Sequence, residues 1–240
     1  MKTKIIHTLA CGLVTLTALS SNSIAMENFS TSANVSLVSE YSFRGIAQSD
    51  EGPAIQGGFD IAHTSGLYAG VWGSNVDFND GDEASVEIDL YAGYSNAYND
   101  INYDLGVIYY SYPGADDSLN YDFWELSAAI GYDFGHFASS ASINYSPDYF
   151  GESGDSYYYA AAVDVPLPYD LGLSAHVGYQ DIDDEAAFGV PDYTDWSLGL
   201  GYSYEGFDFA VQYVDTDLDE PSECADGCAE RIIFSISKSF

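Results

Sequence analysis

Cationic side chains are scarce in this chain of 240 residues. It carries 5 lysines and arginines against 38 aspartates and glutamates, a formal net charge of −33. Phosphate binding needs lysine and arginine to displace counterions, so the composition excludes an electrostatic nucleic-acid binder. It also excludes docking on anionic lipid through a basic patch. The partners of this protein must therefore be recognised by other means than positive charge.

Long apolar runs are missing beyond residue 25. The longest, Tyr157–Val163, ends at Asp164 and is much shorter than the ~20 residues of a membrane-spanning helix. The chain is nevertheless unlike a disordered acidic protein, because 47% of its residues are hydrophobic and 16% are aromatic. Abundant Tyr, Phe, Gly and Ser indicate a β-rich protein, which is either secreted or crosses a membrane as a β-barrel.

The first 25 residues have the organisation of an export signal. Lys2 and Lys4 precede the apolar stretch 5–19, and Ser23-Ile24-Ala25 supplies a small-x-small cleavage site. We predict a cleaved signal peptide over residues 1–25 and a single mature domain over residues 26–240.

Apolar and polar residues alternate from residue 33 onward, with the two-residue period of a β-strand. A clear example is the set Val86, Ile88, Leu90, Ala92 and Tyr94. Each segment is long enough for the ~9–11 residues of a tilted membrane strand. We predict about twelve strands, near residues 33–44, 54–62, 66–76, 84–95, 101–112, 121–133, 136–146, 156–165, 171–181, 193–204, 207–215 and 230–240.

The predicted connections alternate between long and short. Long ones include 45–53 and 216–229, and short ones include 63–65 and 205–206. This alternation is typical of outer-membrane barrels, which have short periplasmic turns and long external loops. We therefore predict an all-β fold, an up-and-down antiparallel transmembrane β-barrel in the bacterial outer membrane. A secreted β-sandwich binding module is the alternative, because polar alternation alone does not separate the two.

Alternate residues of a strand point to opposite faces, and we call each alternate set a parity. Ionised residues in the predicted strands fall mostly on the parity opposite to the apolar residues. Charge facing the middle of a bilayer costs ~2–4 kcal/mol for Arg or Lys, so this parity should face a watery interior. Lys238 is the predicted outward exception, and strand-end aromatics, Tyr41 and Phe43 among them, are predicted to form an outward girdle. The predicted pore-lining residues are Glu40, Arg44, Asp60, Glu87, Asp89, Asp104, Glu125, Asp164, His176 and Arg231.

Arg44 and Arg231 are two of the three cations beyond the signal. If the first and last strands pair, both arginines point inward near the external mouth, facing acids such as Glu125. A basic strip facing acids would orient dipolar solutes at a constriction. The alternative is internal salt bridging that only fills the lumen, for example between Arg44 and Glu40.

Three other motifs have plainer interpretations. Cys224 and Cys228 are predicted to form a disulfide that pins the tip of the last loop, with metal binding as the rival. The oxygen-rich segment Asp77–Glu83 resembles a calcium loop, but its twelfth position is Ile88 rather than Glu, so we expect a polar external loop. We predict no metal site.

Catalytic residues are poorly supported. A Ser-His-acid set around His176, with Ser174 or Ser197, would arise by chance among so many serines and acids. We find neither a phosphate-binding loop nor a dinucleotide fingerprint. We therefore predict that the protein is not an enzyme and binds no cofactor.

Two segments, Val35–Ser49 and Pro53–Asp60, resemble the opening of the TorF-type porin family of proteobacterial outer-membrane proteins, and Gly66–Val76 extends the resemblance. The resemblance implies an outer-membrane porin without indicating its solute. The terminal Phe240, preceded by alternating apolar residues, resembles the signal that the barrel-assembly machinery reads. Lys238 departs from that pattern.

The sequence thus predicts passive diffusion of small polar solutes, neutral or cationic, through an acid-rich lumen. Outer-membrane lipid and the barrel-assembly machinery are the expected partners, and nucleic acid is not. The alternative function within the same fold is a non-conducting barrel whose acidic loops serve adhesion or surface structure. The sequence indicates no oligomeric state.

Overall fold

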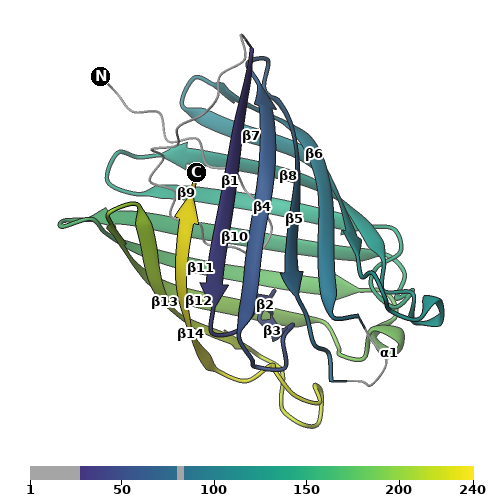
Figure 1. Ribbon diagram of the computed structural model, residues 1–240. Helices are drawn as coiled ribbons and strands as arrows, with labels where there is room; N and C mark the ends of the chain where they lie inside the picture. Colours follow the sequence, from purple (N-terminus) through teal and green to yellow (C-terminus); the bar gives the residue numbers. More distant parts are fainter. Residues whose placement is uncertain (1–27, 80–83) are drawn as a thin grey trace.

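Twelve antiparallel strands close into a barrel in the computed structural model, which describes residues 28–79 and 84–240 (Figure 1). The signal peptide predicted for residues 1–25 lies outside the described residues. Each barrel strand pairs with its neighbours, and pairing of the first with the last closes the cylinder. The strands are β1 (Phe29–Val38), β4 (Ala54–His63), β5 (Leu67–Asn75), β6 (Val86–Tyr98), β7 (Ile101–Ser111), β8 (Phe123–Asp133), β9 (Ala138–Ser146), β10 (Ser156–Leu167), β11 (Leu171–Ile182), β12 (Tyr193–Tyr204), β13 (Phe207–Thr216) and β14 (Arg231–Ser239).

The remaining elements are short. β2 (Ser42–Phe43) and β3 (Ile46–Ala47) form a separate two-stranded sheet. The helical segments are η1 (Asp117–Leu119) and α1 (Glu185–Phe188), both in long loops. Among the described residues, no helix combines the length and the hydropathy needed to cross a membrane.

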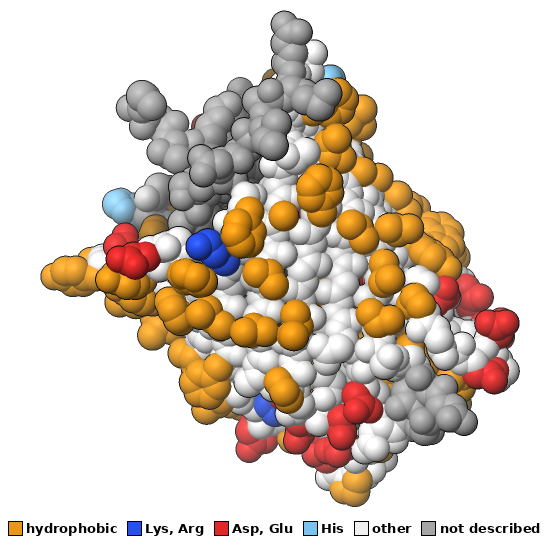
Figure 2. Space-filling view, viewed as in Figure 1, with side chains coloured by type: hydrophobic (Ala, Val, Ile, Leu, Met, Phe, Trp, Pro, Cys, Tyr) orange, Lys and Arg blue, Asp and Glu red, His pale blue; other side chains and the backbone are white. Residues whose placement is uncertain are grey.

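The two faces of the barrel wall differ in chemistry. Side chains such as Leu90, Leu105 and Phe234 are between 55% and 60% exposed on the outside, while their strand neighbours Asp89 and Asp104 are buried. Figure 2 shows hydrophobic side chains spread over the outer wall, with most acidic ones near its ends. Lys238, predicted to be the one outward exception among the charged strand residues, is joined by Asp181 and Asp215, which lie on the outward side at the long-loop ends of their strands.

The predicted up-and-down meander is confirmed, with short turns at one end and long loops at the other (Figure 1). Phe240 pairs with Ala33 through two backbone hydrogen bonds of 2.8 and 3.2 Å, so the C-terminus lies at the short-turn end. Eleven of the twelve predicted strands agree with the structure to within about three residues. Local alternation was therefore sufficient to locate them.

The first strand is the exception. It covers 29–38 rather than 33–44, and the chain then turns into the barrel instead of continuing along the wall. Tyr41 and Phe43, predicted to face outward, lie inside: Tyr41 is 5% exposed, and Phe43 packs on the same interior cluster. The alternation continues past Val38 because β2 is itself extended, so the pattern carried no sign of the change in direction.

Small residues on the inner face make room for tyrosines from adjacent strands. A Cβ added to Gly93 would lie 2.6 Å from the carbonyl oxygen of Leu105 and would collide with the Tyr68 hydroxyl. That hydroxyl donates to Asp104 at 2.8 Å, so it is not free to move away. Glycine at this position therefore permits the packing of β5, β6 and β7.

We expect Gly93→Ala to lower the free energy of unfolding by about 1–3 kcal/mol, because the added methyl group overpacks the inner face. Urea titration of the folded barrel measures this. Gly131→Ala is the matched control, since its Cβ would be 3.5 Å from the nearest atom. Equal effects of the two substitutions would show that close approach at Gly93 is unimportant.

Candidate functional site: the lumen and its inserted segment

Residues 39–53, between β1 and β4, fold into the barrel; we call them the lumenal segment. At its inner end β2 and β3 are joined by Arg44 and Gly45, with φ values of 48° and 83°. Positive φ at both central residues is the requirement of a type I′ hairpin turn. A non-glycine residue is disfavoured in this conformation unless its surroundings impose it. The contacts of the Arg44 side chain must therefore stabilise this turn.

The Arg44 side chain crosses the lumen. One guanidinium nitrogen donates to both carboxylate oxygens of Glu125 at 2.8 and 2.7 Å, and the other donates to Gln180 Oε1 at 2.7 Å. Glu125 lies on β8, the fourth strand from β4, and Gln180 lies on β11, the fourth strand from β1 in the other direction. The tip of the segment is therefore fixed to the opposite wall of the barrel.

Aromatic contacts support the same guanidinium. Its central carbon lies 4.2 Å from the ring centroid of Tyr158 and 4.7 Å from that of Phe43. Cation–π contacts of this kind gain strength when both groups are out of water. Arg44 and Glu125 side chains are each 1% exposed. A buried charge requires such partners, because an unpaired one would cost several kcal/mol.

The lumenal segment is also held from the β14 side. Arg231 donates to Glu40 Oε1 and to the carbonyl oxygen of Gly45, both at 2.6 Å. The Tyr41 hydroxyl, on the other side, donates to Glu87 on β6 at 2.8 Å. The segment thus contacts wall strands on both sides of its entry point as well as across from it.

The layer of side chains at this level is nearly free of solvent contact. Glu87 and Glu125 are 1% exposed, Gln180 is 0% and Tyr193 is 2%. These residues lie on β6, β8, β11 and β12, so the burial extends over the circumference. In this conformation the lumen is filled at the level of Arg44.

Aromatic side chains from the long loops cover this layer. Phe78, Tyr112, Tyr121 and Phe150 pack on one another with ring centroids 4.3–6.0 Å apart. Burial, together with the nearby carboxylates Glu87 and Asp89, raises the pKa of Tyr112 well above its ordinary value, and the pKa of Tyr41 is raised for the same reasons. Both phenols therefore stay protonated and able to donate hydrogen bonds.

Toward the short turns, carboxylates of the barrel wall are hydrogen-bonded to tyrosines. Asp60 and Asp104 accept hydrogen bonds from Tyr91 at 2.5 Å and Tyr68 at 2.8 Å. Nearer the layer of Arg44, His176 Nε2 lies 2.9 Å from the hydroxyl of Tyr158, whose ring contacts Arg44, and 3.2 Å from Asp195 Oδ1. The partners of His176 are thus not Ser174 or Ser197, the serines considered for a catalytic set.

All ten residues predicted to line the pore have the interior parity or lie in the lumenal segment, but their pairing differs from the sequence expectation. Arg44 pairs with Glu125, whereas Glu40, its expected partner, pairs with Arg231. Arg44 also projects from a hairpin rather than from the barrel wall. Their role in lining a conducting pore stays a prediction.

Sequence reasoning missed Gln180 and Tyr158 as partners of Arg44. A neutral glutamine and a tyrosine carry no charge signal, and both are distant from Arg44 in sequence. The one available signal was Arg44-Gly45, a turn-compatible pair inside an apparently continuous strand.

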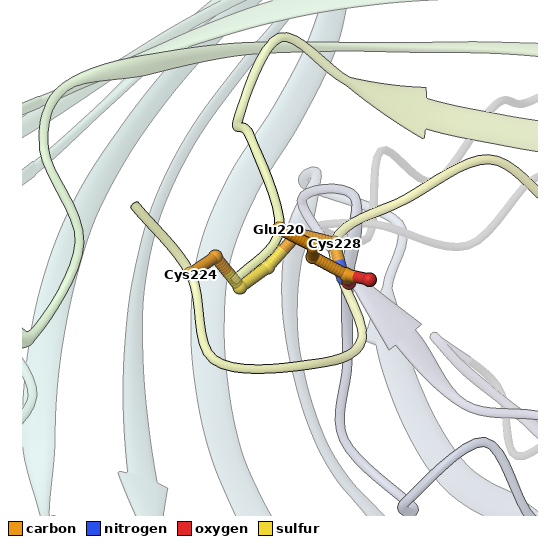
Figure 3. Close-up of side chains that lie close together, drawn as sticks. All are labelled: Glu220, Cys224 and Cys228. Atoms are coloured by element: carbon orange, nitrogen blue, oxygen red, sulfur yellow. A yellow bond between two sulfur atoms is a disulfide. The ribbon is translucent and has the colours of Figure 1, made fainter. Parts of the chain in front are cut away.

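The predicted disulfide is present between Cys224 and Cys228, with their Cα atoms 6.4 Å apart. Figure 3 shows this bond beside Glu220. These three residues form the one metal-compatible group found within the described part of the chain, but both sulfur atoms are committed to the disulfide. In the oxygen-rich segment Asp77–Glu83, residues 80–83 lie outside the described residues.

Comparison with known proteins agrees with this architecture. A closed twelve-stranded antiparallel barrel with an apolar exterior has the architecture of transmembrane β-barrels. The profile of a family described as "Bacterial protein of unknown function (Gcw_chp)" matches residues 23–240, and the chain belongs to that family. A search of curated protein sequences found no match.

Solved structures resemble the chain in fold. The NanC porin has a TM-score of 0.59 at 10% identity, over 87% of this chain and 98% of that one. An outer membrane channel from Pseudomonas putida F1 has a TM-score of 0.49 at 11% identity, over 93% of this chain and all of that one. At such identities the NanC likeness shows the fold alone.

We expect Arg44→Met to lower the free energy of unfolding by about 3–5 kcal/mol, because Glu125 is left buried without its cation. Arg44→Met combined with Glu125→Gln should recover most of the loss. Urea unfolding of the three proteins measures this. A double variant as unstable as the single one would contradict a specific role for the ion pair.

Proposed function

We propose that this protein is a porin-like channel of the bacterial outer membrane for small polar solutes, neutral or cationic. The observation that carries the proposal is the closed cylinder with an apolar outer face and an ionisable inner face. A barrel satisfies every backbone hydrogen bond in lipid and leaves no exposed edge. The resemblance to TorF-type porins and the predicted export signal support the same location, as does the proposed role of Phe240 as a signal for barrel assembly.

Electrostatics supports the preference for neutral or cationic solutes. The two lumenal arginines are each matched by a glutamate, Arg44 by Glu125 and Arg231 by Glu40. The remaining lumenal carboxylates, including Asp60 and Asp104, give the interior a negative field. Rings of carboxylates favour cations and repel anions in channels.

Transport requires an opening in the filled layer of side chains at the level of Arg44. Because the lumenal segment and Arg44 close the lumen, solutes pass only when the segment shifts away from Glu125 and Gln180. The same packing favours the second candidate, a non-conducting barrel with acidic external loops. The two functions differ in one respect, the presence of an open state.

We expect Arg44→Ser to raise the mean conductance in planar bilayers and to shift the reversal potential toward greater cation preference. The substitution removes both the contact across the lumen and one lumenal positive charge. Lys238→Ser is the matched control, since it removes a positive charge from the outer face. An unchanged reversal potential in Arg44→Ser would assign Arg44 to filling the lumen, and absence of conductance steps in both proteins would favour the non-conducting barrel.

We also expect a charged side chain on the outer face to destabilise the barrel in a bilayer. Leu105→Lys, in the middle of β7, should destabilise the bilayer-inserted barrel by ~2–4 kcal/mol. Ser142→Lys, on the inner face of β9, should have a much smaller effect because its ammonium group meets the acidic interior. Unfolding by urea from lipid vesicles measures both. Equal losses would contradict lipid contact on the outer face.

A further inference from the structure

The last long loop, residues 217–230, packs directly against the lumenal segment. Its disulfide is an interior feature: Cys228 is 0% exposed and Cys224 is 5%. Both sulfurs belong to a cluster with Tyr193 and Leu218, against which Ile46 of β3 packs. The cluster that contains the disulfide therefore packs against the segment that fills the lumen, so the bond has more than the loop tip around it.

The backbone of the disulfide loop also holds β3. Ala47 donates its backbone N–H to the carbonyl oxygen of Gly227 at 2.8 Å. The approach is close enough that a Cβ on Gly227, whose φ is +78°, would lie 2.8 Å from the Ala47 side chain. Gly227 lies between the two cysteines, so the loop closed by the disulfide supplies this contact.

The loop is fixed on its other side as well. Glu220 Oε1 accepts from the backbone N–H groups of Cys228 and Ala229, at 2.6 and 3.0 Å. The Thr216 hydroxyl donates to the carbonyl oxygen of Cys228 at 2.7 Å. Cys228 is therefore anchored to β13 and to the first part of the loop, and the disulfide extends this anchorage to Cys224 and Gly227.

We propose that the Cys224–Cys228 disulfide controls occupancy of the lumen: the intact bond keeps the lumenal segment inside the barrel, and its reduction by a thiol releases it. The inference rests on the proposed channel function and adds its regulation. Without the bond, residues 224–228 regain conformational freedom and the Gly227–Ala47 contact weakens. Ile46 also loses a rigid surface to pack on.

The reduction step is ordinary thiol–disulfide exchange. A thiolate attacks the Cys224 sulfur, the more exposed of the two, and the Cys228 thiolate leaves and takes up a proton. A second thiol then resolves the mixed disulfide. With dithiothreitol the two thiols supply two electrons and two protons, and the reagent becomes its cyclic disulfide.

The test uses the chain without residues 1–25, folded into lipid vesicles or planar bilayers. Ser42→Cys, in β2, places a reporter thiol in the lumenal segment, where the serine hydroxyl is shielded from solvent. We expect a membrane-impermeant maleimide to label Cys introduced at this position roughly 10-fold faster when Cys224→Ser and Cys228→Ser are also present. The protein with the disulfide intact is the matched control.

Conductance provides the second measurement. Dithiothreitol should raise the mean conductance of the unsubstituted protein roughly 10-fold, and the Cys224→Ser/Cys228→Ser protein should conduct as much without it. If that variant fails to fold, reduction of the folded unsubstituted protein still gives the result. The reductant should leave the doubly substituted protein unchanged.

Three other outcomes separate this inference from the channel itself. If Arg44→Ser conducts but neither labelling nor conductance depends on the disulfide, the redox control is wrong and the channel stands. If labelling accelerates but no protein conducts, the segment is released as proposed and the channel is wrong. If no protein conducts and labelling does not depend on the disulfide, both are wrong.

Discussion

The ion pair between Arg44 and Glu125 is the interaction on which the interior of this barrel depends. A guanidinium withdrawn from water needs a carboxylate in good geometry, and this one has two bonds of 2.8 and 2.7 Å to Glu125. Because Arg44 is at the tip of a segment that enters between β1 and β4, the pair ties the centre of the lumen to the far wall. The positive φ of Arg44 and the packing of the surrounding aromatics are consistent with that tie.

The small number of cations limits the ion pairs that can form inside the barrel. The lumen contains many carboxylates, yet its two arginines each have a defined glutamate partner at a defined height. Additional cations would offer competing pairs and alternative positions for the lumenal segment. The long loops add a second level of closure through aromatic packing and the disulfide loop. The outer wall needs none of this specificity, since lipid accepts any apolar surface.

The barrel wall could be predicted from sequence because its pattern is local. Each strand alternates between lipid-facing and lumen-facing residues, so Val86–Tyr94 or Leu171–Tyr179 is readable without knowledge of its neighbours. The lumenal segment could not be predicted in the same way. Tyr41 and Phe43 keep the alternation of a wall strand, and only the distant Glu125, Gln180 and Tyr158 make an inward course favourable. The pairing of Glu40 with Arg231, 191 residues apart, is likewise a product of barrel closure.

Hydrogen exchange at the backbone amides of Ala47 and Gln48 tests most directly whether residues 39–53 fill the lumen. These amides donate to Gly227 and Tyr41, at 2.8 and 2.7 Å. A segment packed inside the barrel predicts exchange as slow as that of neighbouring wall strands in the oxidised protein. Exchange at the rate of an unstructured loop would contradict the account, since the lumen would then be open and Arg44 would not span it.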